Sequence, residues 1–285
     1  MADVLKFMES DKLLSEAIAL KGGTAINLTI FDLPRLSVDI DLDYCGSIDR
    51  EKMLADRDVI TVKISKYMSA NGYTLRNYHA LDSFVYEYVN CGGVKDNIKI
   101  EINYMLRCHV LPVARREVKL PWDEEKLTVL SVAPLEIFAS KTVALLTRTA
   151  PRDLYDMYNM VKYGLFDESE EAMLRKCAVF YSAIGAECPP EKFELDNVGN
   201  VSKQQIKRDL APVLRKGERF DLEMVQNEVC KYLVSVLMPT EEEEMFWKVF
   251  AEGRYCPELI FGATAECANV EKHPMALWKC RDKGE

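Results

Sequence analysis

Two short stretches near the N-terminus contain residue types suited to phosphate and metal chemistry. Gly22-Gly23-Thr24 follows one apolar run and opens another. Glycines let backbone N–H groups approach a phosphate closely, and a helix that begins there would favour an anion. Farther on, Asp39, Asp41 and Asp43 alternate with apolar residues. Because side chains switch faces at every residue of a strand, these aspartates share one face.

Carboxylates on one strand face repel each other unless a cation lies between them. Oxygen ligands suit Mg²⁺, which proteins often hold with one or two carboxylates plus phosphate oxygens. A glycine turn close to such a pair therefore predicts nucleotide chemistry. Two plainer interpretations stay open, since Gly-Gly alone is usually a turn and an Asp-x-Asp strand often has a solvated face. Aspartate is depleted in strands, however, which favours the metal site.

Residues 98–104 predict a second strand of the same kind. Isoleucines recur on one face, and Glu101 is among the polar residues on the other. If this strand neighbours the acidic strand, Glu101 lies beside Asp39 and Asp41 and supplies a third carboxylate to one metal site. The alternative is a half-buried strand with a polar outer face.

The second half of the sequence contains cationic residues that could contact a phosphate. A helix that starts at Pro134 has Lys141 and Arg148 on one face, from which both could project to a phosphate tail. Equally, both could be solvated, with their aliphatic stems over the core. Arg152 and Asp156 have i, i+4 spacing and could pair, either to tie the helix surface or to orient Lys141.

Periodicity and turn residues predict the elements that position these side chains. We expect strands at residues 36–44, 73–78, 83–90 and 98–104, with further strands at 113–120 and 127–132. We expect helices at residues 3–20, 24–31, 50–70 (capped by Asp49), from 134, from 151, and at 169–184, 202–214, 222–237 and 241–252. A boundary between residues 125 and 135 separates a mixed region from a helical one.

Composition limits the functional classes. The 285 residues suffice for one large or two ordinary domains, and 48% of them are hydrophobic. A net charge of −9 argues against broad adhesion to nucleic acid or membrane, which leaves local basic patches at Arg115-Arg116, Lys119 and residues 203–216. Nine scattered cysteines without a CxxC pair and no membrane-spanning run predict a cytoplasmic protein that has no membrane partner.

Together these motifs resemble a known family. The string Leu20-Lys21-Gly22-Gly23-Thr24-Ala25, then Arg35-x-Ser37-x-Asp39-x-Asp41, then Glu101, and finally Pro151-Arg152-Asp153-Leu154-Tyr155-Asp156 resembles the AbiEii/AbiGii-type toxins. These belong to the DNA polymerase β-like nucleotidyltransferase superfamily. The resemblance covers residues 15–165. It implies an α+β fold, with a nucleotidyltransferase domain at residues 1–130 and a helical domain at residues 131–285 that supplies Lys141 and the Arg152–Asp156 motif.

The resemblance also implies a mechanism. An NTP would bind with its triphosphate on Gly22-Gly23-Thr24, and Mg²⁺ would bind Asp39, Asp41 and Glu101, the last of which would bind or activate an acceptor hydroxyl. In-line attack on the α-phosphate then releases pyrophosphate. Lys141 would neutralise the triphosphate. Further nucleotide-binding candidates are Arg35, Ser37, Arg148, Arg152, Asp153 and Asp156, of which the last two could instead orient Lys141 or an arginine.

The acceptor and partner follow from the family alone. Its acceptors include the 3′ end of tRNA, and its partner would be a co-encoded antitoxin of an abortive-infection system. Two alternatives remain open. One is a nucleotidyltransferase that acts on a protein hydroxyl or a small molecule, and the other is a nucleotide-binding module without turnover.

Overall fold

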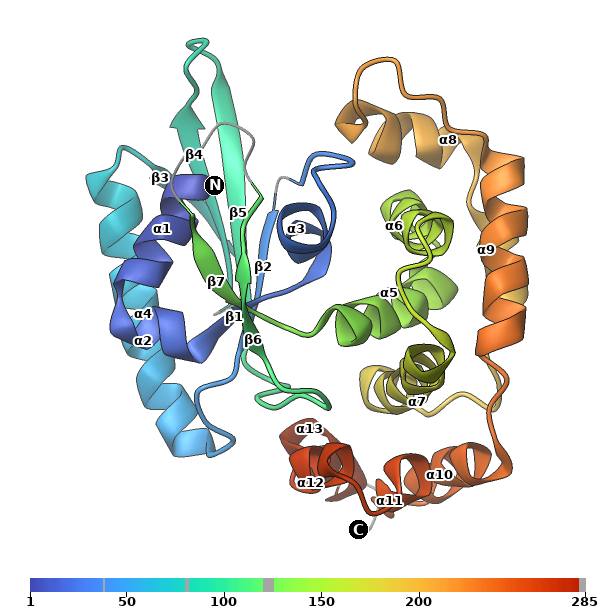
Figure 1. Cartoon of the computed structure of the whole chain (residues 1–285). Coiled ribbons are helices and arrows are strands. Elements are labelled where there is room, and N and C mark those ends of the chain that lie inside the picture. The colour runs from blue at the N-terminus through green and yellow to red at the C-terminus, as the bar shows by residue number, and fades with distance from the viewer. Residues whose placement is uncertain (38, 80–81, 120–125, 282–285) are drawn as a thin grey trace. The chain divides into compact units, whose positions relative to one another are not determined.

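The structure is a computed structural model, which describes residues 1–37, 39–79, 82–119 and 126–281. The chain divides into two compact units. The sheet unit comprises Met1–Leu33 and Ser37–Val132, and the helical unit comprises Pro34–Leu36 and Ala133–Glu285 (Figure 1). Arg35 therefore belongs to the helical unit, although Arg35 precedes the acidic strand in the sequence.

The sheet unit is built on a seven-stranded mixed sheet with strand order β3-β4-β5-β2-β1-β7-β6. The acidic strand β2 (Asp39–Tyr44) pairs in parallel with β5 (Lys95–Asn103) and antiparallel with β1 (Ile18–Leu20). The other strands of the sheet are β3 (Thr74–His79), β4 (Ser83–Val89), β6 (Ala114–Glu117) and β7 (Thr128–Ser131). The acidic strand and the Glu101 strand are therefore neighbours at the centre of the sheet.

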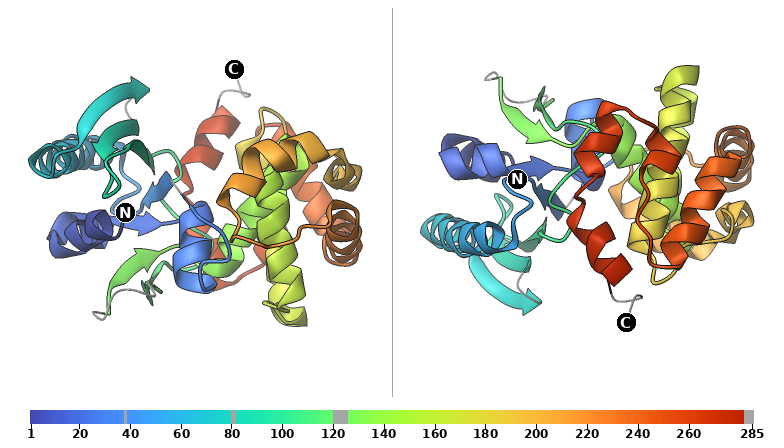
Figure 2. Two further views of the ribbon diagram at one scale, coloured as in Figure 1. Left: turned by 90° about the horizontal axis from the view of Figure 1, so that it is seen from above. Right: turned by 90° about the horizontal axis from the view of Figure 1, so that it is seen from below.

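The two faces of this sheet differ. Helices α1 (Ala2–Ser10), α2 (Lys12–Ala17) and α4 (Arg50–Ala70) lie on one face, while α3 (Gly22–Ala25) and the π-helical turn Ile26–Ile30 lie on the other (Figures 1 and 2). The apolar residues of the central strands, such as Ile40, Leu42 and Ile100, are completely buried. The polar residues that alternate with them take the opposite face, that of α3, because the strand period is two.

The predicted helix at residues 3–20 is wrong in its second half. Asp11 interrupts it, since its carboxylate accepts hydrogen bonds from the backbone N–H groups of Leu13 and Leu14 and so caps a new helix, α2. The last three residues, Ile18–Leu20, form β1 instead, completely enclosed between β2 and β7. A buried central strand reads as a continuous apolar run, which periodicity alone does not distinguish from a buried helix.

Other predicted elements agree more closely with the structure. Helix α4 spans the predicted residues, and the Asp49 carboxylate accepts from the Lys52 N–H at its start. Strand β5 begins three residues earlier than predicted, at Lys95, and β2 begins at Asp39 rather than at residue 36. Val38, residue 120 of the predicted strand 113–120 and the start of the boundary at residue 125 lie outside the described residues.

The helical unit contains α5 (Pro134–Arg148), α6 (Pro151–Lys162), α7 (Glu168–Gly185), α9 (Leu222–Val236) and α10 (Glu241–Ala251) close to their predicted places (Figure 1). Residues 202–214 are not one α-helix as predicted but change pitch, through α8 (Lys203–Gln205), a π-helical turn (Ile206–Leu210) and a 3-10 turn (Ala211–Val213) that contains Pro212. Elements that the sequence did not indicate are a 3-10 turn at Leu195–Asn200 and the short helices α11 (Glu258–Phe261), α12 (Ala265–Val270) and α13 (Pro274–Arg281).

None of the helices in the described ranges combines the length and the apolar composition that crossing a bilayer requires.

Candidate active site

The register of β2 against β5 brings two of the predicted carboxylates together. Asp41 is the direct partner of Glu101, and Asp39 is the partner of Lys99. Residues opposed in a parallel pair point to the same face, so Asp41 and Glu101 stand side by side on the α3 face. On the far edge of β5, Glu101 is opposed by Ser83 of β4. Ser83, Glu101 and Asp41 therefore form a row across three strands.

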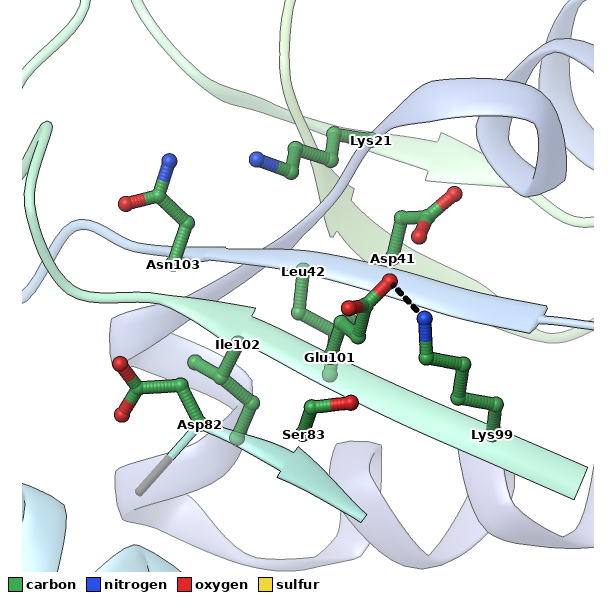
Figure 3. Close-up of a pocket in the computed structure, with 9 residues that line it drawn as sticks. All are labelled: Lys21, Asp41, Leu42, Asp82, Ser83, Lys99, Glu101, Ile102 and Asn103. Atoms are coloured by element: carbon green, nitrogen blue, oxygen red, sulfur yellow. Dashed lines mark ion pairs between the residues drawn. The ribbon is translucent and has the colours of Figure 1, made fainter. Parts of the chain in front are cut away.

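This row lines a cavity of about 730 Å³ within the sheet unit (Figure 3). Figure 3 shows Asp41 and Glu101 in its middle, with Lys21 and Lys99 on opposite sides of them. The lining residues are Lys21, Asp41, Leu42, Asp82, Ser83, Lys99, Glu101, Ile102 and Asn103. Of these, the sequence had indicated only Asp41 and Glu101 as site residues. Lys99 and Asn103 follow the same alternation as Glu101, which was the available signal for them.

Gly22 lies against the Asp41 carboxylate. Its φ of +62° is in the left-handed region, and a Cβ at this position would stand 2.6 Å from Asp41 Oδ2. A side chain of any size would therefore displace the carboxylate, so glycine is required here for space as well as for backbone conformation. The Lys21 N–H also donates to the Asp41 carbonyl at 2.9 Å, which fixes the glycine turn to β2.

Thr24 uses its hydroxyl inside the protein. The side chain is completely buried, and its Oγ1 lies 2.8 Å from Ser37 Oγ and donates to the Asp39 carbonyl. Thr24 and Ser37, both predicted to bind nucleotide, thus hold the start of β2 against α3. Their hydroxyls are thus engaged within the protein, and neither residue is among those that line the cavity. A nucleotide contact from either residue stays a prediction.

Two ion pairs flank the carboxylate row. Lys99 Nζ lies 2.8 Å from Glu101 Oε2, where both side chains are exposed in part. Lys21 Nζ lies 2.6 Å from Asp43 Oδ1, and the Asp43 side chain is only 4% exposed. His109 Nε2 is 3.9 Å from the other oxygen of Asp43. Asp43 is therefore a buried counterion for a lysine that lines the cavity.

The residues predicted in the second half gather in a separate network within the helical unit. Lys141, only 8% exposed, has its Nζ 2.6 Å from Asp153 Oδ1 and 2.9 Å from Asp156 Oδ2. Arg35 donates to both Asp156 oxygens, from Nε at 2.8 Å and Nη2 at 2.7 Å, and Arg148 Nε lies 2.7 Å from Asp153 Oδ2.

The ion pairs of Asp156 differ from the Arg152–Asp156 pair that the i, i+4 spacing suggests. The Asp156 carboxylate is held by Arg35 and Lys141, while Arg152, its possible i, i+4 partner, is half-buried in the first turn of α6. Burial favours the neutral forms of these groups. The facing charges outweigh it, however, so the pKa of Lys141 is raised and the pKa of Asp153 is lowered. Lys141 and Asp153 thus remain charged at neutral pH.

The oxygen donors of the cavity suit Mg²⁺ in type and number, because that ion is often held by one or two carboxylates plus phosphate oxygens. Asp41 and Glu101 are the pair that register brings together. A cluster of three or more His, Cys, Asp or Glu side chains close enough to hold an ion is not found among the residues that the structure describes. Asp39, the third predicted ligand, lies at the neighbouring same-face pair of positions, opposite Lys99.

Comparison with known proteins adds to this geometry. Residues 6–228 match the family described as "Nucleotidyl transferase AbiEii toxin, Type IV TA system". MenT4, a nucleotidyltransferase toxin of Mycobacterium tuberculosis H37Rv, shares the fold with a TM-score of 0.63 at 16% identity, over 86% of this chain and 84% of that one. No curated protein matches the sequence.

Because the family match extends over most of the sequence, the chain belongs to the AbiEii family of nucleotidyltransferase toxins of type IV toxin–antitoxin systems. A toxin of this family uses an NTP as substrate and has an antitoxin as partner.

Proposed function

We propose that this toxin uses Mg²⁺ to transfer an NMP from an NTP to a hydroxyl group of an RNA in the cytoplasm, such as the 3′ end of a tRNA. The observation that carries the proposal is the Asp41–Glu101 pair, opposed in register on neighbouring strands, with Gly22 against the Asp41 carboxylate. The cavity that they line is large enough for a nucleotide.

We assign a role to each predicted site residue of the sheet unit. Asp41 and Glu101, with Asp39 at the neighbouring pair of positions, would hold the metal, which would stabilise charge on the transferring phosphate as a Lewis acid. Glu101 also accepts the proton of the attacking hydroxyl. The turn at Gly22-Gly23 leaves room for the phosphates, and Thr24 with Ser37 keeps β2 in position.

Catalysis then depends on positioning and charge. The acceptor oxygen forms a bond to the α-phosphorus, the bond to the β-phosphate breaks, and pyrophosphate leaves with the electron pair. Two carboxylates that are fixed by strand register need little reorganisation to meet this charge, and preorganised electrostatics of this kind is often the largest contribution to catalysis.

The network of the helical unit has an excess of positive charge. Arg35, Lys141 and Arg148 face the two carboxylates of Asp153 and Asp156. Lys141 has two carboxylate partners and is only 8% exposed, so little of its ammonium group is open to a phosphate from solvent. Arg148, whose side chain is 63% exposed, is the member better placed to meet a phosphate from solvent. We propose that Lys141 and the two aspartates chiefly orient the arginines.

The acceptor is tested by incubation of the protein with labelled NTPs, Mg²⁺, total cell RNA and lysate protein. We expect label in RNA, and uptake by protein or by small molecules alone would refute the RNA proposal in favour of the alternative transferases. Wild-type protein that labels no fraction would instead favour a nucleotide-binding module without turnover.

The carboxylate roles are tested by Asp41→Ala, which should abolish transfer while the protein remains folded. Asp58→Ala is the matched control, because it removes one negative charge from an exposed position of α4 in the same unit. Circular dichroism checks folding of both variants. Full activity of Asp41→Ala would eliminate the metal role that we assign to this residue.

A further inference from the structure

Phosphate binding in the sheet unit requires a positive charge that the roles above do not supply. The cavity is lined by carboxylates from Asp41, Asp82 and Glu101, and its cationic lining residues are Lys21 and Lys99. Lys99 is engaged with Glu101 at 2.8 Å. A triphosphate is itself strongly anionic, and the charge of a metal held by carboxylates is already met in part, so protein cations must meet much of the phosphate charge.

Lys21 is placed to meet that charge. It directly precedes the glycine turn, and its N–H is bonded to the Asp41 carbonyl. Its ammonium group lies 2.6 Å from Asp43 Oδ1, with 28% of the side chain exposed against 4% for Asp43. An ammonium has three donors, and Asp43 accepts from one of them, so the lysine can donate to a ligand without losing its buried partner.

The buried partner also fixes the lysine. A solvated lysine loses side-chain entropy when it binds a ligand. The Lys21 side chain is already ordered by its ion pair with Asp43 of β2, so it loses less. His109 closes the other side of Asp43, at 3.9 Å. Lys21 is thus bonded to β2 twice, from its ammonium group to Asp43 and from its N–H to the Asp41 carbonyl. Figure 3 shows Lys21 on the side of the cavity opposite Lys99.

We propose that the Lys21 ammonium binds a non-bridging oxygen of the β- or γ-phosphate of the NTP, with Asp43 as its positioning residue. This inference rests on the proposed function, since it assigns the phosphate end of that same cavity. Lys21 therefore stabilises the pyrophosphate as it leaves, and the acceptor approaches from the β4–β5 side, where Glu101 and Ser83 lie. The competing interpretation is that Lys21 only neutralises Asp43.

The two interpretations differ in how binding depends on phosphate number. The NTP that wild type binds best is titrated, with its di- and monophosphate, against wild type, Lys21→Met and Lys21→Arg by calorimetry in Mg²⁺ without acceptor. A charge-assisted hydrogen bond contributes roughly 1.5–3 kcal/mol, so Lys21→Met should weaken NTP binding by about tenfold or more. It should weaken NMP binding by less than about twofold, and Lys21→Arg should retain most of the affinity.

Lys21→Met leaves the Asp43 carboxylate buried without its lysine, which endangers folding. The double variant Lys21→Met/Asp43→Asn removes both charges and should show the same selective loss of NTP affinity. Lys63→Met is the matched control, since Lys63 is paired with Asp11 in the same unit and does not line the cavity.

Equal losses for NTP and NMP, or unchanged NTP binding in the double variant, would overturn the assignment of Lys21. Absence of NTP binding by the wild-type protein would overturn the proposed function instead, so the two failures are distinguishable.

Discussion

Gly22→Ala tests whether the glycine turn exists to make room for the Asp41 carboxylate. An alanine at a φ of +62° costs about 1–2 kcal/mol of left-handed strain. Its Cβ would stand 2.6 Å from Asp41 Oδ2, whereas ordinary contacts begin near 3.4 Å, so the carboxylate must move by about 3.4 − 2.6 = 0.8 Å. Misplacement of a reacting group by about 1 Å can cost about 100-fold in rate.

Gly72→Ala separates these two effects. Gly72 follows α4 at a φ of +80°, and a Cβ there meets nothing within 4 Å. Both variants should therefore lose about 1–2 kcal/mol of unfolding free energy from strain, measured by urea denaturation. Only Gly22→Ala should also lose about 100-fold or more in the rate of NMP transfer. Equal transfer rates in the two variants would refute the claim that Gly22 protects the position of Asp41.

A double-mutant cycle of Gly22→Ala and Asp41→Ala measures the same steric interference through the free energy of unfolding. Asp41→Ala removes the oxygen that the new Cβ would strike, so Gly22→Ala should be less destabilising in that background. A coupling of roughly 0.5–3 kcal/mol is usual for groups in direct contact. Additive effects on unfolding free energy would mean that the two side chains do not interfere, which contradicts the packing described here.

Three further predictions concern charge, metal and helix capping. Asp153→Asn should destabilise the protein by up to about 3–5 kcal/mol at neutral pH, because buried Lys141 loses one of its two carboxylate partners and Arg148 loses the carboxylate that it contacts. The lowered pKa of Asp153 means that its contribution is present above its ordinary pKa and is lost as pH falls below it. Unfolding midpoints of wild type and variant should therefore converge in acid, and a constant difference down to about pH 2 would contradict the charged pair. Chelation of divalent ions should abolish transfer, and added Mg²⁺ should restore it, whereas continued transfer in chelator would exclude the metal role. Thr240→Ala should cost about 1 kcal/mol in urea denaturation, because Thr240 and Glu243 form the capping box of α10; an unchanged midpoint would show that this cap contributes nothing.

Local patterns allowed much of the sheet unit to be predicted. The alternation in residues 39–44 and 98–103 gave two strands with carboxylates on one face, and Asp49 marked the start of α4. The prediction failed at Ile18–Leu20, where a completely apolar run is a central strand rather than the end of a helix. The prediction of one α-helix at residues 202–214 was wrong, because α-, π- and 3-10-helical turns differ by only one residue in their hydrogen-bond spacing. Such a difference leaves the pattern of apolar residues almost unaltered.

The cavity is where sequence reasoning was least complete. Asp41 and Glu101 were named because a pair of carboxylates has an evident chemistry. Lys21, by contrast, is a single lysine beside a turn in the sequence, and its importance arises from its ion pair with Asp43 of β2. Asp43 itself shares the face of Asp39 and Asp41 but is not among the predicted metal ligands.

By itself, the sequence determined the residue faces and the family. A strand has a period of two, so the spacing of Asp39, Asp41 and Asp43 fixes a common side before any partner is known. Only the tertiary structure decided that Asp41 meets Glu101, that Gly22 lies against Asp41, and that Lys141 is buried between two aspartates. Those facts depend on the register of strands some sixty residues apart and on helix packing, which are set by long-range burial rather than by local periodicity.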